Sequence, residues 1–275
     1  PTSLSTLLCP LYLRALGMKV PTLGVPGRPA GGVDILATIP GYRVHLDSDE
    51  VEHILDECGY CHFIADQRWT PADAELFRFR QRIGAQRLPP LIIASLLAKK
   101  LAVGLNNVGL DVRVAAHGNF GTSFAVARVN AERFVRVAAL LGIRAVCILT
   151  DATTAYQPYI GRGEALLALS LLLSGRAPDS LIRHARECLQ MCRAVVPEGA
   201  LPAVESDQLF RLFAKNLEFQ GSSPDKFNKR VRVLKSAPRG LLRAVRSGYV
   251  QLDLNRVRRI LVHEQEKAAS VSEFP

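Results

Sequence analysis

The sequence contains few aromatic residues and no long apolar run, and both shortages narrow the kinds of protein that it can encode. Phe, Trp and Tyr make up 7% of its 275 residues, with a single Trp. The longest apolar run, at 165–173 with Ser170 inside it, is much shorter than the roughly 20 residues that span a bilayer. The opening residues have no basic leading segment, so we expect no secretory signal peptide. We therefore expect a cytoplasmic protein without a membrane partner.

Cysteine is also scarce, with six residues in 275, and we expect no disulfide framework. Two cysteines lie in the string CGYCH at 58–62, which has the form of a c-type haem attachment site. Acidic residues open a helical pattern before the string and Gly59 ends it, so the string straddles a helix-to-strand junction. Cys61 and His62 would then point to opposite faces of a strand. No second axial ligand is recognisable, so haem is not expected.

Two further interpretations of these cysteines remain open. Cys58 and Cys61 could form a redox dithiol, or they could share a four-ligand zinc site with the helical pair Cys188 and Cys192. We favour reduced, mostly buried thiols, because spectator cysteines are the commoner case, and we expect no metal.

Positive charge is in excess and is unevenly distributed. The formal net charge is +10, and eleven Lys or Arg lie between Lys226 and Arg259 against a single acid, Asp253. Such a balance favours anionic partners such as a phosphorylated metabolite or inorganic phosphate. A nucleic-acid surface is the weaker interpretation, because few aromatic side chains interleave with these cations to stack on bases.

Hydrophobic periodicity predicts an α/β fold. The ranges 107–115 and 143–150 have the pattern of β-strands. Helical patterns lie between and after them, at 130–142 with Asn130 as the expected cap, and at 163–175 and 179–195. Strands separated by helices predict a largely parallel sheet flanked by helices.

The pattern of the sequence changes after Gly221. A turn-rich segment is followed by basic residues whose alternation predicts short strands, so we expect a small, basic, β-rich C-terminal appendage. We place the boundary near residue 222, with an α/β core at 1–221 and the C-terminal segment at 222–275.

Several stretches together resemble one enzyme family. They are IASLLAKKLAVGL at 93–105, TPAD at 70–73, LDVRV at 110–114, ILTD at 148–151, PAGGVDILA at 29–37, and the segment APRGLLRAVRSGYVQLDLNRVRRI at 237–260. They resemble motifs of the thymidine/pyrimidine-nucleoside phosphorylases, and most closely those of the archaeal-type thymidine and AMP phosphorylase branch. The resemblance covers nearly the whole chain.

The resemblance implies a fold and an activity. The implied fold is a nucleoside phosphorylase/phosphoribosyltransferase-like core in a homodimer. The implied activity is phosphorolysis of a pyrimidine nucleoside or nucleotide to a free base and a phosphorylated sugar. Inorganic phosphate would be the co-substrate, and no metal or organic cofactor would be required.

The resemblance also implies a base-binding set. In the family an arginine, a serine fifteen residues later and a lysine four beyond that hold the pyrimidine, and the same spacing falls on Arg80, Ser95 and Lys99. Ser95 and Lys99 share one face of a helix. Two cations and a hydroxyl can hydrogen-bond the base carbonyls and stabilise the negative charge that develops on the departing base.

The phosphate side departs from the family pattern. The sequence begins where the family's glycine-rich Lys-His-Ser-Thr-Gly-Gly-type loop would have ended, and Ser3 matches a phosphate-binding serine just after it. Gly32 replaces a phosphate-contacting threonine and Ala37 replaces a glutamate, while Asp34 remains. We therefore interpret the phosphate-binding part as degraded or missing, with Ser3 and Asp34 as its remaining candidates.

One further carboxylate is a candidate catalytic group. Asp66 occupies a position similar to that of the proton donor of AMP phosphorylases, one residue out of register. A general acid near a leaving base is reasonable chemistry. The alternative for the whole protein is a catalytically degenerate relative that binds a nucleobase, a nucleotide or a protein partner without turnover.

Overall fold

The computed structural model describes residues 3–27, 31–85, 88–116, 118, 120–154, 156–197 and 202–237, and then 240, 241, 243–248, 253, 256, 257, 259, 260 and 263. The helices and strands of this part are, in chain order, α1 (Ser3–Ala15), β1 (Val20–Gly24), α2 (Gly32–Leu36), α3 (Ser48–Glu57), β2 (Tyr60–Ile64), α4 (Pro71–Arg82), α5 (Pro89–Ala102), β3 (Asn107–Val114), α6 (Phe124–Leu140), β4 (Arg144–Asp151), α7 (Arg162–Leu173), α8 (Asp179–Val195), α9 (Ser206–Phe219) and α10 (Pro224–Ser236).

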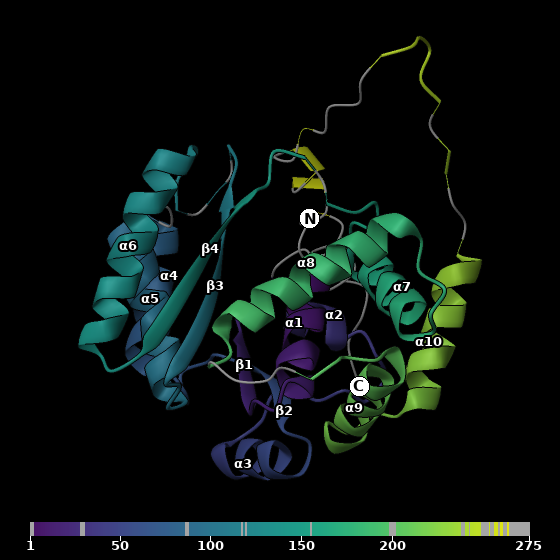
Figure 1. The fold of residues 1–275 in the computed structure, drawn as a ribbon, viewed down its shortest axis with the longest axis horizontal. Coiled ribbons are helices and arrows are strands. Elements are labelled where there is room, and N and C mark those ends of the chain that lie inside the picture. Colours follow the sequence, from purple (N-terminus) through teal and green to yellow (C-terminus); the bar gives the residue numbers. More distant parts are fainter. Residues whose placement is uncertain are drawn as a thin grey trace.

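The strands form two parallel pairs, β1 with β2 and β3 with β4 (Figure 1). The register aligns Val20 with Tyr60 in the first pair and Asn107 with Arg144 in the second. Parallel neighbours need a crossover connection, which α2 and α3 supply in the first pair and α6 in the second. The α/β prediction with parallel strands is confirmed. Within the described residues the strands make two separate pairs rather than one continuous sheet.

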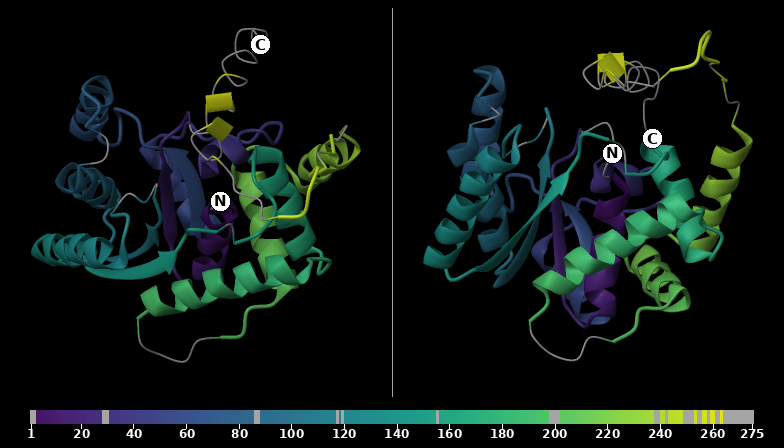
Figure 2. Two further views of the ribbon diagram at one scale, coloured as in Figure 1. Left: turned by 90° about the horizontal axis from the view of Figure 1, so that it is seen from above. Right: turned by 45° about the horizontal axis from the view of Figure 1, so that its top comes forward.

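Two hydrophobic cores correspond to the two strand pairs. In the larger core α1 is surrounded by α7, α8, α9 and the β1–β2 pair, and Leu4, Leu8 and Phe63 are fully buried there. The smaller core lies between α5, α6 and the β3–β4 pair, around Val112 and Phe134. Helix α8 packs against β3 and β4 as well as α1, and so connects the two cores (Figure 2).

The CGYCH string lies at a helix-to-strand junction, as predicted. Helix α3 opens with a capping box, in which the Asp47 side chain accepts from the Glu50 backbone N–H and the Glu50 side chain accepts from that of Asp47. Cys58 ends the helix, and Gly59 turns the chain at a φ of 84° that a residue with a Cβ rarely adopts. All five residues of β2 are buried.

The cysteines of the described residues are free thiols. Those on α8 lie beside α1 rather than beside β2, since the Cys192 thiol contacts the carbonyl oxygen of Cys9 at 3.5 Å. Within the described part of the chain, no group of three or more His, Cys, Asp or Glu side chains is arranged to hold a metal ion.

Helix α6 begins earlier than the sequence predicted. Its cap is Ser123, whose hydroxyl accepts from the backbone N–H of Val126, and the helix runs from Phe124. Asn130 is therefore not a cap, and that prediction was wrong. The buried Asn130 amide instead donates to the carbonyl of Phe120 at 2.7 Å, which ties the helix to the loop before it.

The prediction of short strands after Gly221 was wrong for the described residues up to 236. Ser223 caps helix α10 by accepting from the backbone N–H of Lys226, and Pro224 occupies the first turn, where its missing N–H has no cost. Phe227 and Val231 lie one helical turn apart and are buried against the larger core, next to α7 and α9. Most of 237–275 lies outside the described residues, including much of the family-like segment at 237–260.

Among the described residues, no helix combines the length and the apolar character that crossing a bilayer requires.

Candidate functional site

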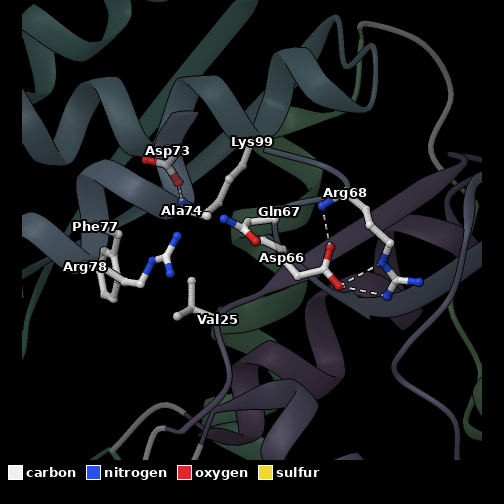
Figure 3. Close-up of a pocket in the computed structure, with 10 residues that line it drawn as sticks. Val25, Asp66, Gln67, Arg68, Asp73, Ala74, Phe77, Arg78 and Lys99 are labelled. Carbon is white, nitrogen blue, oxygen red and sulfur yellow. Dashed lines mark hydrogen bonds and ion pairs between the residues drawn. The ribbon is translucent and has the colours of Figure 1, made fainter. Parts of the chain in front are cut away.

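A cleft of about 450 Å³ opens beyond the carboxyl ends of β1 and β2, opposite helices α4 and α5 (Figure 3). This is the edge of parallel strands where ligands of α/β proteins commonly bind, and the volume suits a small molecule. The cleft is lined by Val25, Ala65, Asp66, Gln67, Arg68, Asp73, Ala74, Phe77, Arg78 and Lys99.

Helix α5 brings Lys99 and Ser95 together. The ammonium group of Lys99 donates to the Ser95 hydroxyl at 2.9 Å and to the Ser95 carbonyl oxygen at 3.1 Å, as their spacing of four residues predicts. Lys99 also forms an ion pair with Asp73 of α4. All three residues are buried, and Lys99 and Asp73 border the cleft. The ion pair thus joins α4 to α5 at the wall of the cleft.

Arg80 lies behind this wall instead of in the cleft. Arg80 is 3% exposed, and its guanidinium donates to the carbonyl oxygens of Leu91, at 3.1 Å, and of Ala85, at 3.4 Å. Arg80 therefore fastens the connection between α4 and the first turn of α5. Of the predicted base-binding set, the structure joins Ser95 and Lys99 and directs Arg80 to the backbone.

Asp66 follows β2 and lines the cleft, but it is engaged by Arg68. Its carboxylate accepts from the Arg68 backbone N–H at 2.9 Å and from the guanidinium at 2.7 and 3.0 Å. These hydrogen bonds lower the pKa of Asp66 below its ordinary value. The carboxylate is therefore ionised at neutral pH, and in this arrangement it is an acceptor. Its role as a proton donor stays a prediction.

Asp34 stabilises the loop that follows β1. Its carboxylate accepts from the Gly27 backbone N–H at 2.9 Å and lies 3.3 Å from the guanidinium of Arg162 on α7. Ser3 is the first residue of α1, and its side chain lies outside the described part of the structure. The predicted phosphate-binding roles of Ser3 and Asp34 stay predictions.

Most of the lining residues were not singled out from the sequence, and three of them have large side chains that face the cleft from β2 and α4. Gln67 follows β2, whereas Phe77 and Arg78 lie on α4. The signal was present in part, because Asp73 of the TPAD motif and Phe77 are four residues apart and share a helix face. Periodicity alone does not show which face of α4 is directed toward the β1–β2 pair, so these residues could not be assigned to the cleft from the sequence.

Comparison with known proteins shows several relatives that carry the same name. No protein-family model matches the chain. The chain is 31% identical over 261 residues to a protein of Agrobacterium fabrum named thymidine phosphorylase, an alignment that covers 90% of this chain and 59% of the relative. It is 33% identical over 169 residues to one of Mycobacterium tuberculosis and 31% identical over 171 residues to one of Homo sapiens, both also named thymidine phosphorylase. These alignments cover 39% and 35% of the relatives.

The chain therefore spans less than two thirds of the length of these relatives. The first of these alignments extends over most of the chain. The comparisons thus support a relationship between this chain and the thymidine phosphorylases.

Proposed function

We propose that the cleft binds a pyrimidine nucleoside or nucleotide, and that the chain provides this part of a pentosyltransferase of the thymidine phosphorylase type. The observation that carries the proposal is the buried Lys99–Ser95–Asp73 cluster at the wall of a cleft beyond parallel strands. The similarity to proteins named thymidine phosphorylase points in the same direction.

The proposed reaction is a displacement at the anomeric carbon of the sugar. A phosphate oxygen forms a bond to that carbon while the bond to the pyrimidine nitrogen breaks, and the electron pair of the broken bond passes to the base. Lys99 would stabilise the negative charge that the base acquires, because an ammonium held by fixed partners is already oriented for it. Ser95 and Asp73 act as positioning residues, since both hold the Lys99 ammonium.

The remaining site residues belong to this proposal as candidates. Arg80 would position the base-binding residues by holding α4 to the start of α5. Asp66 would exchange a proton with the base once its hydrogen bonds to Arg68 are broken. Ser3 and Asp34 would lie on the phosphate side. Inorganic phosphate is the proposed co-substrate, with no metal or organic cofactor, and a cytoplasmic homodimer of the archaeal-type branch is the proposed context.

A base-release assay tests the proposal. The protein is incubated with phosphate and, in turn, thymidine, uridine, cytidine monophosphate and adenosine monophosphate, and free base is quantified. We expect release from at least one pyrimidine compound and strong loss of it in Lys99→Gln. Lys19→Gln is the matched control, because Lys19 is exposed at the opposite end of β1.

Absence of turnover with every compound would contradict the enzymatic proposal. If a pyrimidine then still bound and Lys99→Gln abolished that binding, the chain would be the catalytically degenerate binder. If no pyrimidine bound at all, both the enzymatic proposal and the pyrimidine-binding alternative would be excluded.

A further inference from the structure

The charged residues that line the cleft include one more cation than carboxylates, and the extra cation is Arg78. Five of the lining residues are charged, three of them cations and two carboxylates. Lys99 is paired with Asp73, and Arg68 is paired with Asp66 at 2.7 Å. Among the described residues, Arg78 has no hydrogen bond or ion pair, so the excess positive charge of the cleft resides on its guanidinium.

The position of Arg78 follows from helix geometry. Successive residues of a helix are turned by about 100°, so Arg78 and Arg80 lie on opposite faces of α4. The face of Arg80 is turned to α5, where its guanidinium binds backbone carbonyls. Figure 3 shows Arg78 extending from α4 toward Val25, which follows β1, and toward Gln67, which follows β2.

We propose that Arg78 binds a phosphate group of the ligand in this cleft. The proposal rests on the proposed function and assigns the phosphate a protein partner that the sequence did not suggest. A guanidinium presents two parallel N–H donors that match two oxygens of one phosphate, and it stays charged at any physiological pH. Because the neighbouring ion pairs are internally neutral, an anion is the ligand that compensates the remaining charge.

The location of Arg78 suits this role. Among the described residues, the β1 end contributes the apolar Val25 to the lining of the cleft, and Gly32, the first residue of α2, is not part of that lining. Arg78 reaches toward that end of β1 from the opposite wall. A phosphate between them would thus receive its donors from α4.

The phosphate group has two possible sources, inorganic phosphate and the 5′-phosphate of a nucleotide. Calorimetric titrations with inorganic phosphate, uridine and uridine monophosphate separate them, with Arg78→Gln, Arg78→Lys and Arg82→Gln as variants. Arg82 is the matched control, because it lies one turn further along α4, is exposed and does not line the cleft.

We expect Arg78→Gln to weaken binding of at least one phosphate compound by about tenfold or more, as for the loss of a charge-assisted bidentate contact. Uridine affinity should change less than about twofold, Arg78→Lys should retain part of the affinity, and Arg82→Gln should match the wild type. Weakened binding of inorganic phosphate identifies the co-substrate. Weakened binding of the nucleotide alone identifies the 5′-phosphate.

The inference is overturned if Arg78→Gln binds both phosphate compounds as the wild type does, or if the wild type binds neither. The base site is tested separately by the uridine titration. If uridine binds to the wild type and Lys99→Gln abolishes that binding, the proposed function is supported even when the inference on Arg78 fails. Conversely, phosphate binding that depends on Arg78 while uridine fails to bind would support Arg78 and contradict the base site.

Discussion

Burial determines the chemistry of individual side chains around β2. His62 is 2% exposed, its Nδ1 atom has no hydrogen-bond partner among the described residues, and burial lowers its pKa to about 4. Burial also raises the pKa values of the thiols of Cys58 and Cys61. At neutral pH these residues are an uncharged imidazole and two protonated thiols. Neither thiol is in the thiolate form that redox exchange or metal binding requires.

The lowered pKa of His62 predicts a pH dependence of stability. Between pH 4 and about 6.5 the unfolded chain binds a proton at His62 that the folded chain does not bind, so stability decreases as the pH falls through this window. At a pH where His62 of the unfolded chain is fully protonated, the free energy of unfolding is lower by up to about 3 kcal/mol. We expect His62→Phe to flatten the dependence of the unfolding free energy on pH between 4 and 6.5, measured by urea unfolding.

The exposed His45 supplies the control for this measurement. His45→Phe should leave the pH dependence as in the wild type. An equal slope in the wild type and in His62→Phe would contradict the assignment of that slope to His62.

At the scale of elements, helix α9 is joined to β2 by a buried side-chain network. Gln220, at the end of α9, is fully buried and donates to the carbonyl oxygens of His62, at 2.8 Å, and of Arg43, at 2.7 Å. Its amide oxygen accepts from the backbone N–H of His62 at 2.9 Å. Gln220 therefore satisfies backbone groups on the edge of β2 that faces away from β1.

Replacing Gln220 tests this connection. Gln220→Leu replaces the amide with an apolar side chain of similar size and leaves the buried backbone N–H and carbonyl groups of His62 without these partners, each at a cost of about 1–3 kcal/mol. We expect the free energy of unfolding to fall by about 3 kcal/mol or more. Gln81→Leu, at an exposed position of α4, should stay within about 0.5 kcal/mol of the wild type. A similarly small effect of Gln220→Leu would contradict the structural role of the network.

The elements were predictable wherever local signals and burial agreed. The α3–β2 junction, the strands β3 and β4, and the Ser95–Lys99 spacing on α5 all follow from short-range patterns. The direction of Arg80 does not, because residues at the start of α5 supply its acceptors and only the folded chain brings them near. Helix α10 was missed because its basic exposed face and its buried Phe227 and Val231 resemble strand alternation in sequence.

At the scale of the whole molecule, α8 connects the two cores by close packing on β3. Gly109 faces Val195 so closely that a Cβ added at Gly109 would overlap the Cγ2 atom of Val195. The guanidinium of Arg144 on β4 donates to the Val195 carbonyl oxygen at 2.9 Å and so fixes the end of α8. The glycine thus permits the approach of the helix that joins the cores.

A double substitution tests this packing. Gly109→Ala should lower the free energy of unfolding by about 1–3 kcal/mol through overpacking. Val195→Ala removes the overlapping methyl groups, so the double variant should be more stable than the sum of the two single effects predicts. Additive effects in urea unfolding would show that α8 does not contact β3 in this way.

The central claim is that a pyrimidine binds in the cleft against the Lys99 ammonium. The most direct measurement is the calorimetric affinity of the wild type, Lys99→Gln and Lys19→Gln for uridine and thymidine, with folding of each variant checked by circular dichroism. We expect Lys99→Gln to weaken binding by about tenfold or more, as for a lost hydrogen bond to a charged group, and Lys19→Gln to bind as the wild type does. Equal affinity of Lys99→Gln and the wild type would contradict the account.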